Sequence, residues 1–469
     1  MRSILLFLLL PTAAAAQLPP IKLTLDPAPE AKPSLRYELL PNSRDAVPGN
    51  AVLHYLRAHA SRPAEETDAA KRKAEYETVI RWEDAKPDAI PVKDVAEYLK
   101  RYKAMFRELE YGARCKECDW SSAPSSGADA INDTVGGVQS HRELARWLSL
   151  RFKLEIAEKR YDDAIRTIQT GLQFGRHVAG GPSMIQMLVG NAIVSIFLAR
   201  IDTLIEQPDS PNLYWALSTL PKPLVDIRPG LDGEDRLTES FLPGIAELRK
   251  GPLIAERALE LTSSSMKAFQ QLTNAGGLVD LGLRLGLTVH AEANQEAARK
   301  ELIARGRSAR EVAAMPAVQA VFLNSFERYR DLADDYRKWF LLGGPDAVIG
   351  IEKIAERLKK LKVDSKDDPL THVLLGLLPA AEKVFFSFAR TERRVAQLRA
   401  LEAIRLHAAA SGQLPKELAD IKKVPVPNDP MTGKPFVYEL VEGGFTLTPN
   451  DPKATAHLGH KYEVAMRIK

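Results

Sequence analysis

The residues of this sequence best suited to chemistry are two cysteines, Cys115 and Cys118, separated by two residues. Such a pair can form a disulfide, carry out thiol–disulfide exchange or supply half of a zinc site. Exchange of the thioredoxin type needs a thiol at the start of a helix that follows a strand, because the helix N-terminus lowers the thiol pKa. Here a helical pattern precedes the pair and a Ser-rich stretch follows. We therefore expect a structural disulfide, with a redox pair, free thiols or half a metal site as alternatives.

The histidines are scattered and predict no metal site. His457 and His460 have the spacing of one helix face but lie in a polar tail, whereas His54 and His59 are five residues apart and share no face. Neither pair has the carboxylate pattern of a known metal motif. We interpret these histidines as surface or packed residues.

One long predicted helix carries a dense group of charged residues: Asp331, Asp334, Asp335, Arg328, Arg330 and Arg337. Spacings of three and four residues allow such side chains to form ion pairs. General acid–base catalysis by two carboxylates needs one pKa raised by burial, which depends on tertiary structure. The charge pattern therefore favours ion pairs over a catalytic site.

Familiar catalytic and cofactor motifs are absent from the sequence. It contains no Gly-x-Ser-x-Gly, no phosphate-binding loop and no His-Glu-x-x-His. Residues 276–287 alternate Gly, Leu and charge without the spacing of a dinucleotide fingerprint. We predict no catalytic residue and no cofactor. The formal net charge is only +4 over 469 residues, which gives no reason to expect nucleic acid as a partner.

The first residues have the pattern of a secretory signal peptide. Arg2 supplies a positive charge, the apolar run Ile4–Leu10 follows, and small residues occupy positions 13–16. We expect cleavage between Ala16 and Gln17 and export to the periplasm or cell envelope. The apolar run is shorter than the roughly 20 residues that span a bilayer. The later apolar stretches 185–198 and 370–388 contain polar residues, so we expect core helices and no membrane span after cleavage.

The remaining pattern predicts a mainly α protein. Hydrophobic residues make up 45% and charged residues 27% of the chain, which is ordinary for a globular protein. We expect a multi-helix body, a Pro-rich extended N-terminal arm and a small C-terminal α+β hairpin module. The predicted segments are a signal peptide at 1–16, the arm at 17–49, N-terminal helices and a Ser/Gly linker at 50–137, a central helical body at 138–369, and a long helix with a hairpin tail at 370–469.

Several residues mark where these elements begin and end. Asn50 is a suitable N-cap for a helix from residue 51, and Ser308 with Glu311 has capping-box spacing. Pro316 predicts a kink in the helix that Ser308 opens. Gly412 fits the end of the last long helix. In the arm, residues 21–25 alternate as a strand does, and residues 34–40 can form a second short strand.

The segment 145–177 partly resembles a tetratricopeptide repeat. Tyr161, Ala164, Ile165 and Leu172 match four positions of that family. Phe152 stands where the family has a small residue, and Lys159 replaces the turn glycine. Since no second copy follows at the 34-residue period of that family, the resemblance implies a single helical hairpin.

The segment 395–448 resembles the globular part of type II secretion pseudopilins. The residues that carry the resemblance are Gly412, Leu414, Pro415, Leu418, Asn428, Asp429, Pro430, Gly433, Pro435, Phe436 and Tyr438. The resemblance implies a turn followed by a β-hairpin, with Phe436 and Tyr438 packed on the long helix. The pilin N-terminal helix and the calcium loop of major pseudopilins are missing, so neither pilus assembly nor a calcium site is carried over. The complete pattern is similar to a group of uncharacterised exported bacterial helical proteins.

The function expected from these features is that of an exported, non-catalytic helical scaffold or binding protein of the cell envelope. Its expected partner is another envelope protein or a surface polymer. The first alternative is a hydrolase of unfamiliar type with carboxylates in a helical cleft. The second alternative, which rests on the tail, is an accessory of secretion or pilus machinery.

Overall fold

The computed structural model describes residues 19–64, 67–120, 128–233, 244–273, 280–364, 381–451 and 459–468, with Leu242, Thr371 and Leu375. The signal segment and its cleavage site between Ala16 and Gln17 lie outside these residues, so export stays a prediction. The chain divides into two compact units. Of the described residues, those at 128–134 and those between Leu231 and Phe385 belong to the first unit. Those at 19–120, 135–230 and 386–468 belong to the second.

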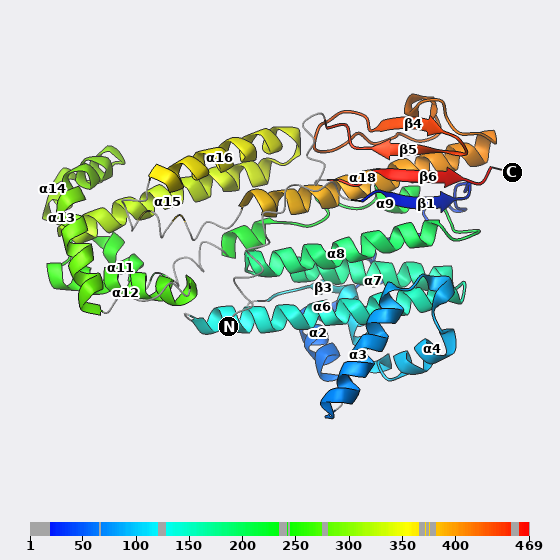
Figure 1. The fold of residues 1–469 in the computed structure, drawn as a ribbon, viewed down its shortest axis with the longest axis horizontal. Coiled ribbons are helices and arrows are strands. Elements are labelled where there is room, and N and C mark those ends of the chain that lie inside the picture. The colour runs from blue at the N-terminus through cyan, green and yellow to red at the C-terminus, as the bar shows by residue number, and fades with distance from the viewer. Residues whose placement is uncertain are drawn as a thin grey trace. The chain divides into compact units, whose positions relative to one another are not determined.

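The described chain is mainly helical with a small mixed sheet, which confirms the predicted fold class in its coarse form (Figure 1). The longer helices are α2 (Ala51–Ala60), α3 (Ala69–Asp84), α4 (Val92–Lys100), α5 (Lys103–Arg114), α6 (Ala128–Ala157), α7 (Tyr161–Ala179), α8 (Met184–Ile205), α12 (Ala255–Thr273), α13 (Asp280–Ala304), α15 (Ala317–Leu342), α16 (Gly344–Asp364) and α18 (Ala381–Ser411). Shorter helices are η1 (Pro87–Ala89), α9 (Tyr214–Ser218), α11 (Ile245–Lys250), α14 (Ala309–Ala314) and η2 (Leu418–Asp420). The strands are β1 (Ile21–Leu25), β2 (Val47–Asn50), β3 (Cys115–Glu117), β4 (Val437–Val441), β5 (Gly444–Thr448) and β6 (Tyr462–Met466).

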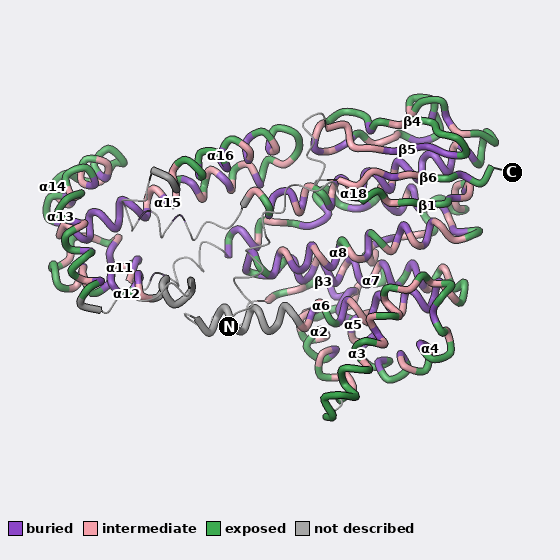
Figure 2. Tube along the Cα trace, in the orientation of Figure 1, coloured by how far each residue is buried: buried purple, intermediate pink, exposed green. Residues whose placement is uncertain are grey.

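Glycines allow α7 and α8 to pack closely in the second unit. A Cβ at Gly190 would lie 2.2 Å from the Ala179 backbone nitrogen, and one at Gly175 would lie 2.9 Å from the Gly190 carbonyl oxygen. Backbone atoms cannot move aside as a side chain can, so these positions require glycine. The buried faces of both helices form much of the core of this unit (Figure 2).

Among the described residues, α8 is the one helix long and apolar enough to cross a membrane. Its most apolar window is 61% buried inside the protein. The Asn191 side-chain amide on α8 donates to the Ser387 carbonyl oxygen at 3.2 Å, which places this helix against α18. Both observations support the prediction of a core helix for residues 185–198.

The four-stranded sheet joins strands from the two ends of the described chain. Its order is β1-β6-β5-β4, with β1 parallel to β6 and the other two pairs antiparallel. Leu23 and Leu25 of β1 are buried, as the alternating pattern predicts. Residues 34–40 form turns instead of the expected second strand, and there the Leu40 carbonyl oxygen accepts a hydrogen bond from the Gln169 side chain at 3.0 Å. The Gln169 side chain therefore satisfies a backbone carbonyl group that a neighbouring strand would satisfy in a sheet.

The tail contains the predicted hairpin, formed by β4 and β5 with Gly443 at φ 71° in the turn. Asp429 organises the preceding turn, since its side chain accepts from the Met431 N–H at 3.0 Å and its carbonyl oxygen accepts from the Gly433 N–H at 2.8 Å. The buried Asp429 carboxylate also forms an ion pair with buried Arg393 of α18 at 2.9 Å.

Other residues of the tail motif also have structural roles. Phe436 is buried, and the Tyr438 hydroxyl donates to the Pro415 carbonyl oxygen at 2.9 Å. The Asn428 side chain donates to the Gly433 carbonyl oxygen at 3.0 Å. Gly412 follows α18 with φ 72°, as expected for a helix C-terminus. These contacts explain why the segment needs these residue types.

Several predicted boundaries differ from the structure. The helix α6 already begins at Ala128, so residues 128–137 belong to a helix and not to a linker. The helix expected to kink at Pro316 is two helices, α14 and α15, which Met315 and Pro316 separate. Ser308 makes no side-chain capping hydrogen bond. Proline removes a backbone donor and clashes with the preceding turn, which explains the complete break.

The charged residues of α15 form ion pairs with other segments of the first unit. Asp331 pairs with Arg305 at 2.7 Å, and Asp335 pairs with Arg357 at 2.6 Å. Arg328 pairs with Glu301. Asp335 also pairs with Lys338, and Arg330 with Glu327, at i,i+3 spacing within α15. The ion pairs predicted for a solvated or interhelical face are therefore present.

Candidate functional site

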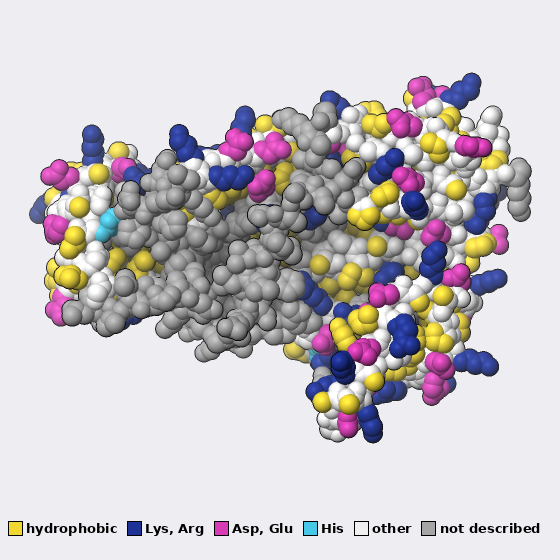
Figure 3. Space-filling model, viewed as in Figure 1, with side chains coloured by type: hydrophobic (Ala, Val, Ile, Leu, Met, Phe, Trp, Pro, Cys, Tyr) yellow, Lys and Arg dark blue, Asp and Glu magenta, His cyan; other side chains and the backbone are white. Residues whose placement is uncertain are grey.

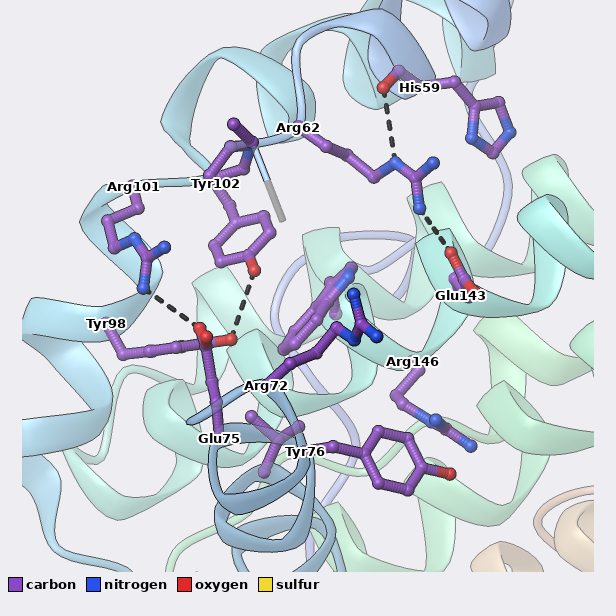
Figure 4. Close-up of a pocket in the computed structure, with 14 residues that line it drawn as sticks. His59, Arg62, Arg72, Glu75, Tyr76, Tyr98, Arg101, Tyr102, Glu143 and Arg146 are labelled. Carbon is purple, nitrogen blue, oxygen red and sulfur yellow. Dashed lines mark hydrogen bonds and ion pairs between the residues drawn. The ribbon is translucent and has the colours of Figure 1, made fainter. Parts of the chain in front are cut away.

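A pocket of about 340 Å³ lies in the second unit. It is formed by the end of α2, the following loop, α3, α4, the turn between α4 and α5, and α6 (Figure 4). Its lining residues are His59, Arg62, Pro63, Ala64, Arg72, Glu75, Tyr76, Val79, Tyr98, Arg101, Tyr102, Glu143, Arg146 and Trp147. Basic, acidic and apolar side chains are interspersed on the surface in the region of α3 and α4 (Figure 3).

Local sequence explains how these elements present their side chains. Asp68 caps α3, since its side chain accepts from the backbone N–H groups of Ala70 and Lys71 at 2.8 and 3.0 Å. On α6, residues 143, 146 and 147 are three and four positions apart, so they share one helix face. Tyr98 and Tyr102 are also four positions apart, Tyr98 in α4 and Tyr102 directly before α5. Each element therefore brings a short group of polar and aromatic side chains to the same space.

Carboxylates neutralise most of the arginines of the pocket. Arg101 pairs with Glu75 at 3.1 Å, and Arg62 pairs with Glu143. Arg146 pairs with Glu83 at 3.1 Å, just outside the lining. These ion pairs hold three guanidinium groups in fixed positions.

Arg72 differs from the other arginines of the pocket. Within the part of the chain that the structure describes, no carboxylate pairs with its guanidinium. The side chain extends from α3 toward the middle of the lining residues (Figure 4). With four arginines and two glutamates in the lining, the pocket is basic. An anion is the ligand that such a group attracts.

Three aromatic residues form one wall. The Tyr102 and Trp147 rings are stacked with centroids 4.6 Å apart, and the Tyr98 ring lies 5.6 Å from Trp147. The Tyr98 and Tyr102 hydroxyls are hydrogen-bonded at 3.1 Å. Burial raises the pKa of both phenols above the ordinary value, so both stay protonated at neutral pH.

A pair of histidines lies at one side of the pocket. His59 Nε2 and His141 Nδ1 are 3.2 Å apart, in hydrogen-bonding contact. Burial lowers the pKa of His59 to about 4 and that of His141 to about 3, so both rings are neutral at pH 7. The other nitrogen of His59, Nδ1, is buried and has no hydrogen-bond partner among the described residues.

The histidine pair adjoins a buried polar and aromatic cluster. The Tyr55 hydroxyl is 2.7 Å from His177 Nδ1, and the Gln173 side chain is 2.7 Å from His177 Nε2. Trp120 donates to the His177 carbonyl oxygen at 2.6 Å and lies 5.1 Å from the His141 ring. Burial lowers the pKa of His177 to about 4. These contacts satisfy the buried polar groups and fix the position of His141.

The two cysteines are free thiols in this structure and do not lie at disulfide distance. The Cys115 thiol contacts the Tyr111 carbonyl oxygen at 3.5 Å, and the Cys118 thiol contacts the His177 carbonyl oxygen at 3.7 Å. The expected disulfide is therefore not formed here, because each thiol packs against a different carbonyl group. Burial raises the pKa of Cys118 to about 12, which is the opposite of what a reactive thiol needs.

The structure separates the histidine pairs that the sequence suggested. His54 Nδ1 contacts the Glu108 carboxylate at 2.8 Å, whereas His59 contacts His141. His460 lies 3.4 Å from the Pro19 carbonyl oxygen, and His457 lies outside the described residues. Over the described ranges, no group of three or more His, Cys, Asp or Glu residues could hold a metal ion.

Sequence reasoning did not find the pocket. Its walls come from segments separated by up to 88 positions, from His59 to Trp147, and the lining forms no contiguous motif. The only local signal was the spacing of Tyr98 and Tyr102, which is equally typical of a core-facing helix. No protein-family model, curated protein sequence or solved structure matches the chain. The two sequence resemblances therefore stay predictions.

Proposed function

We propose that this chain is a non-catalytic binding protein of the cell envelope whose pocket binds a small anionic ligand. The observation that carries the proposal is Arg72, a guanidinium directed into the pocket without a carboxylate partner among the described residues. A bound carboxylate or phosphate would complete the pairing that the other arginines of the pocket already have.

The size and lining of the pocket support a small-molecule ligand. Its volume of about 340 Å³ lies at the lower end of the range of roughly 300–1,000 Å³ for ligand sites. Trp147, Tyr98 and Tyr102 provide apolar surface, Arg72 provides the positive charge, and ion pairs hold the other polar side chains of the pocket. Side chains that are already held in place lose little entropy on binding, which favours affinity.

The hydrolase alternative receives less support. Glu75 and Glu143 line the pocket, but each is held by an arginine. Burial raises the pKa of Glu83 to about 7, yet this carboxylate faces Arg146 and is not part of the lining. An acid–base pair needs two carboxylates with separated pKa values that both face the substrate.

The proposal is tested by calorimetric titration of benzoate and inorganic phosphate into the full chain. We expect binding of at least one of these anions, and a loss of about tenfold or more in affinity for Arg72→Ala, since a charge-assisted hydrogen bond contributes roughly 1.5–3 kcal/mol. Arg81→Ala is the matched control, because Arg81 lies on the same helix, is exposed and does not line the pocket. Its affinity should equal that of the wild type.

The same preparation tests export. Protein for the titrations is taken from the envelope fraction, where mass spectrometry should find a chain that begins at Gln17. An intact chain among cytosolic proteins would contradict the envelope role. Absence of binding by both anions, or equal affinities of wild type and Arg72→Ala, would contradict the anion site.

A further inference from the structure

We infer that the ligand of this pocket is an acidic sugar, meaning a polyhydroxylated ring that carries a carboxylate. This inference rests on the proposed anion site and adds the chemistry of the rest of the ligand. It uses the carboxylates and the aromatic side chains of the pocket in addition to Arg72.

The pocket offers acceptors as well as positive charge. The carboxylates of Glu75 and Glu143 are acceptors only; Glu75 accepts from Arg101 and Tyr98, and Glu143 accepts from Arg62, which leaves lone-pair positions on both for further donors. A ligand with hydrogen-bond donors suits these oxygens. An anion without donors would leave them facing its apolar surface, which is unfavourable.

The aromatic wall of the pocket, formed by Tyr98, Tyr102 and Trp147, suits one side of a sugar ring. The faces of aromatic rings carry the negative part of the ring quadrupole. The C–H groups on one side of a sugar ring carry partial positive charge and form a flat surface, so they pack well on such faces. A pocket of about 340 Å³ has room for one or two sugar rings.

These features together define how the ligand lies in the pocket. The carboxylate pairs with Arg72, hydroxyl groups donate to Glu75 and Glu143, and one ring face lies on the aromatic wall. The same chemistry is offered by a free uronic acid and by the end of an acidic polysaccharide. An envelope location would bring the pocket into contact with either source.

The test is calorimetric titration of the full chain with three probes of similar ring size. Glucuronate has both the carboxylate and the hydroxyl groups, glucose lacks the carboxylate, and cyclohexanecarboxylate lacks the hydroxyl groups. We expect glucuronate to bind at least about tenfold more tightly than either of the others. This preference should be lost in Arg72→Ala and kept in Arg81→Ala.

If cyclohexanecarboxylate binds as tightly as glucuronate, the acidic-sugar inference is overturned and the anion site remains. If glucose binds as tightly as glucuronate, the pairing of Arg72 with a carboxylate is overturned. If none of the three probes binds, the acidic-sugar inference is overturned, and the anion site is overturned as well only if benzoate and phosphate also fail to bind. Two further probes, galacturonate and digalacturonate, separate the sources: tighter binding of digalacturonate indicates a polymer end, and equal binding indicates the free sugar.

Discussion

At the scale of single residues, Lys159 shows how a departure from a family pattern affects the backbone. It lies in the turn between α6 and α7 with φ 58°, a left-handed conformation that favours glycine. The Arg160 N–H donates to the Glu155 carbonyl oxygen at 2.8 Å, which closes the turn as in a Schellman motif. The resemblance to a tetratricopeptide repeat singled out this position because the family has glycine there.

Lys159→Gly should therefore stabilise the protein. Relief of the left-handed strain exceeds the additional entropy that glycine loses on folding, so we expect a gain of about 0.5–1 kcal/mol in the free energy of unfolding. Urea denaturation followed by circular dichroism measures this change. Lys159→Ala keeps the Cβ and should change the stability little. Equal effects of both substitutions would show that the backbone conformation is not the cause.

At the scale of elements, α3 is attached to the body by few apolar contacts. Val79 is its one buried residue among those described, and most of its surface is exposed (Figure 2). Lys153 of α6 anchors its C-terminal end, where the buried ammonium group donates to the Ala85 carbonyl oxygen at 2.7 Å and also to the Glu83 carbonyl oxygen. A positive charge at a helix C-terminus also interacts favourably with the helix dipole.

Lys153→Met should make α3 more mobile and so lower the affinity of the pocket for its ligand. The substitution keeps most of the apolar stem but removes the donor, which leaves the carbonyl groups at the end of α3 unsatisfied. We expect the amide hydrogens of α3 to exchange about tenfold faster, while those of α7 and α8 exchange at the wild-type rate. Hydrogen exchange with mass spectrometry measures both.

The matched control is Lys73→Met on α3 itself. The Lys73 side chain is 78% exposed and forms only a long ion pair with Glu77 at 3.9 Å. Exchange in α3 should stay at the wild-type rate in this variant. Unchanged exchange in Lys153→Met would show that other contacts hold α3.

At the scale of the whole molecule, buried histidines couple stability to pH. Burial lowers the pKa of His141 from 6.5 to about 3, so the folded chain keeps this ring neutral at pH 5 whereas the unfolded chain protonates it. Its contribution to stability is present above pH 6.5 and is lost progressively as the pH falls toward 3. Buried acids act in the opposite direction, because burial raises the pKa of Glu83 to about 7 and that of Asp202 to about 6.

A comparison with His141→Asn isolates the histidine from these acids. From pH 7 to pH 5 the wild type should lose about 2 kcal/mol more stability than the variant, because the unfolded histidine gains most of a proton over this interval. Urea denaturation at both pH values measures the difference. A variant with the same pH dependence as the wild type would contradict the assignment.

The sequence by itself determined features that depend on neighbouring residues. Asn50 caps α2, since its side chain accepts from the Val52 N–H at 3.1 Å. Gly412 follows α18 in a left-handed conformation, and the segment from Asn428 to Tyr438 leads into the hairpin. Helix periodicity, caps and turn residues act over a few positions, so they can be recognised without knowledge of the fold.

Only the tertiary structure decided the features that depend on distant segments. The strand β1 pairs with β6, the Ile21 register partner being Tyr462, and β1 had been assigned to an extended arm. The contact between His59 and His141 joins residues 82 positions apart, and the pocket joins α3, α4 and α6. Burial sets the pKa values of these histidines, and packing decides that Arg72 has no carboxylate beside it among the described residues. Burial and packing arise only when the elements assemble, and the spacing of residues along the chain does not contain them.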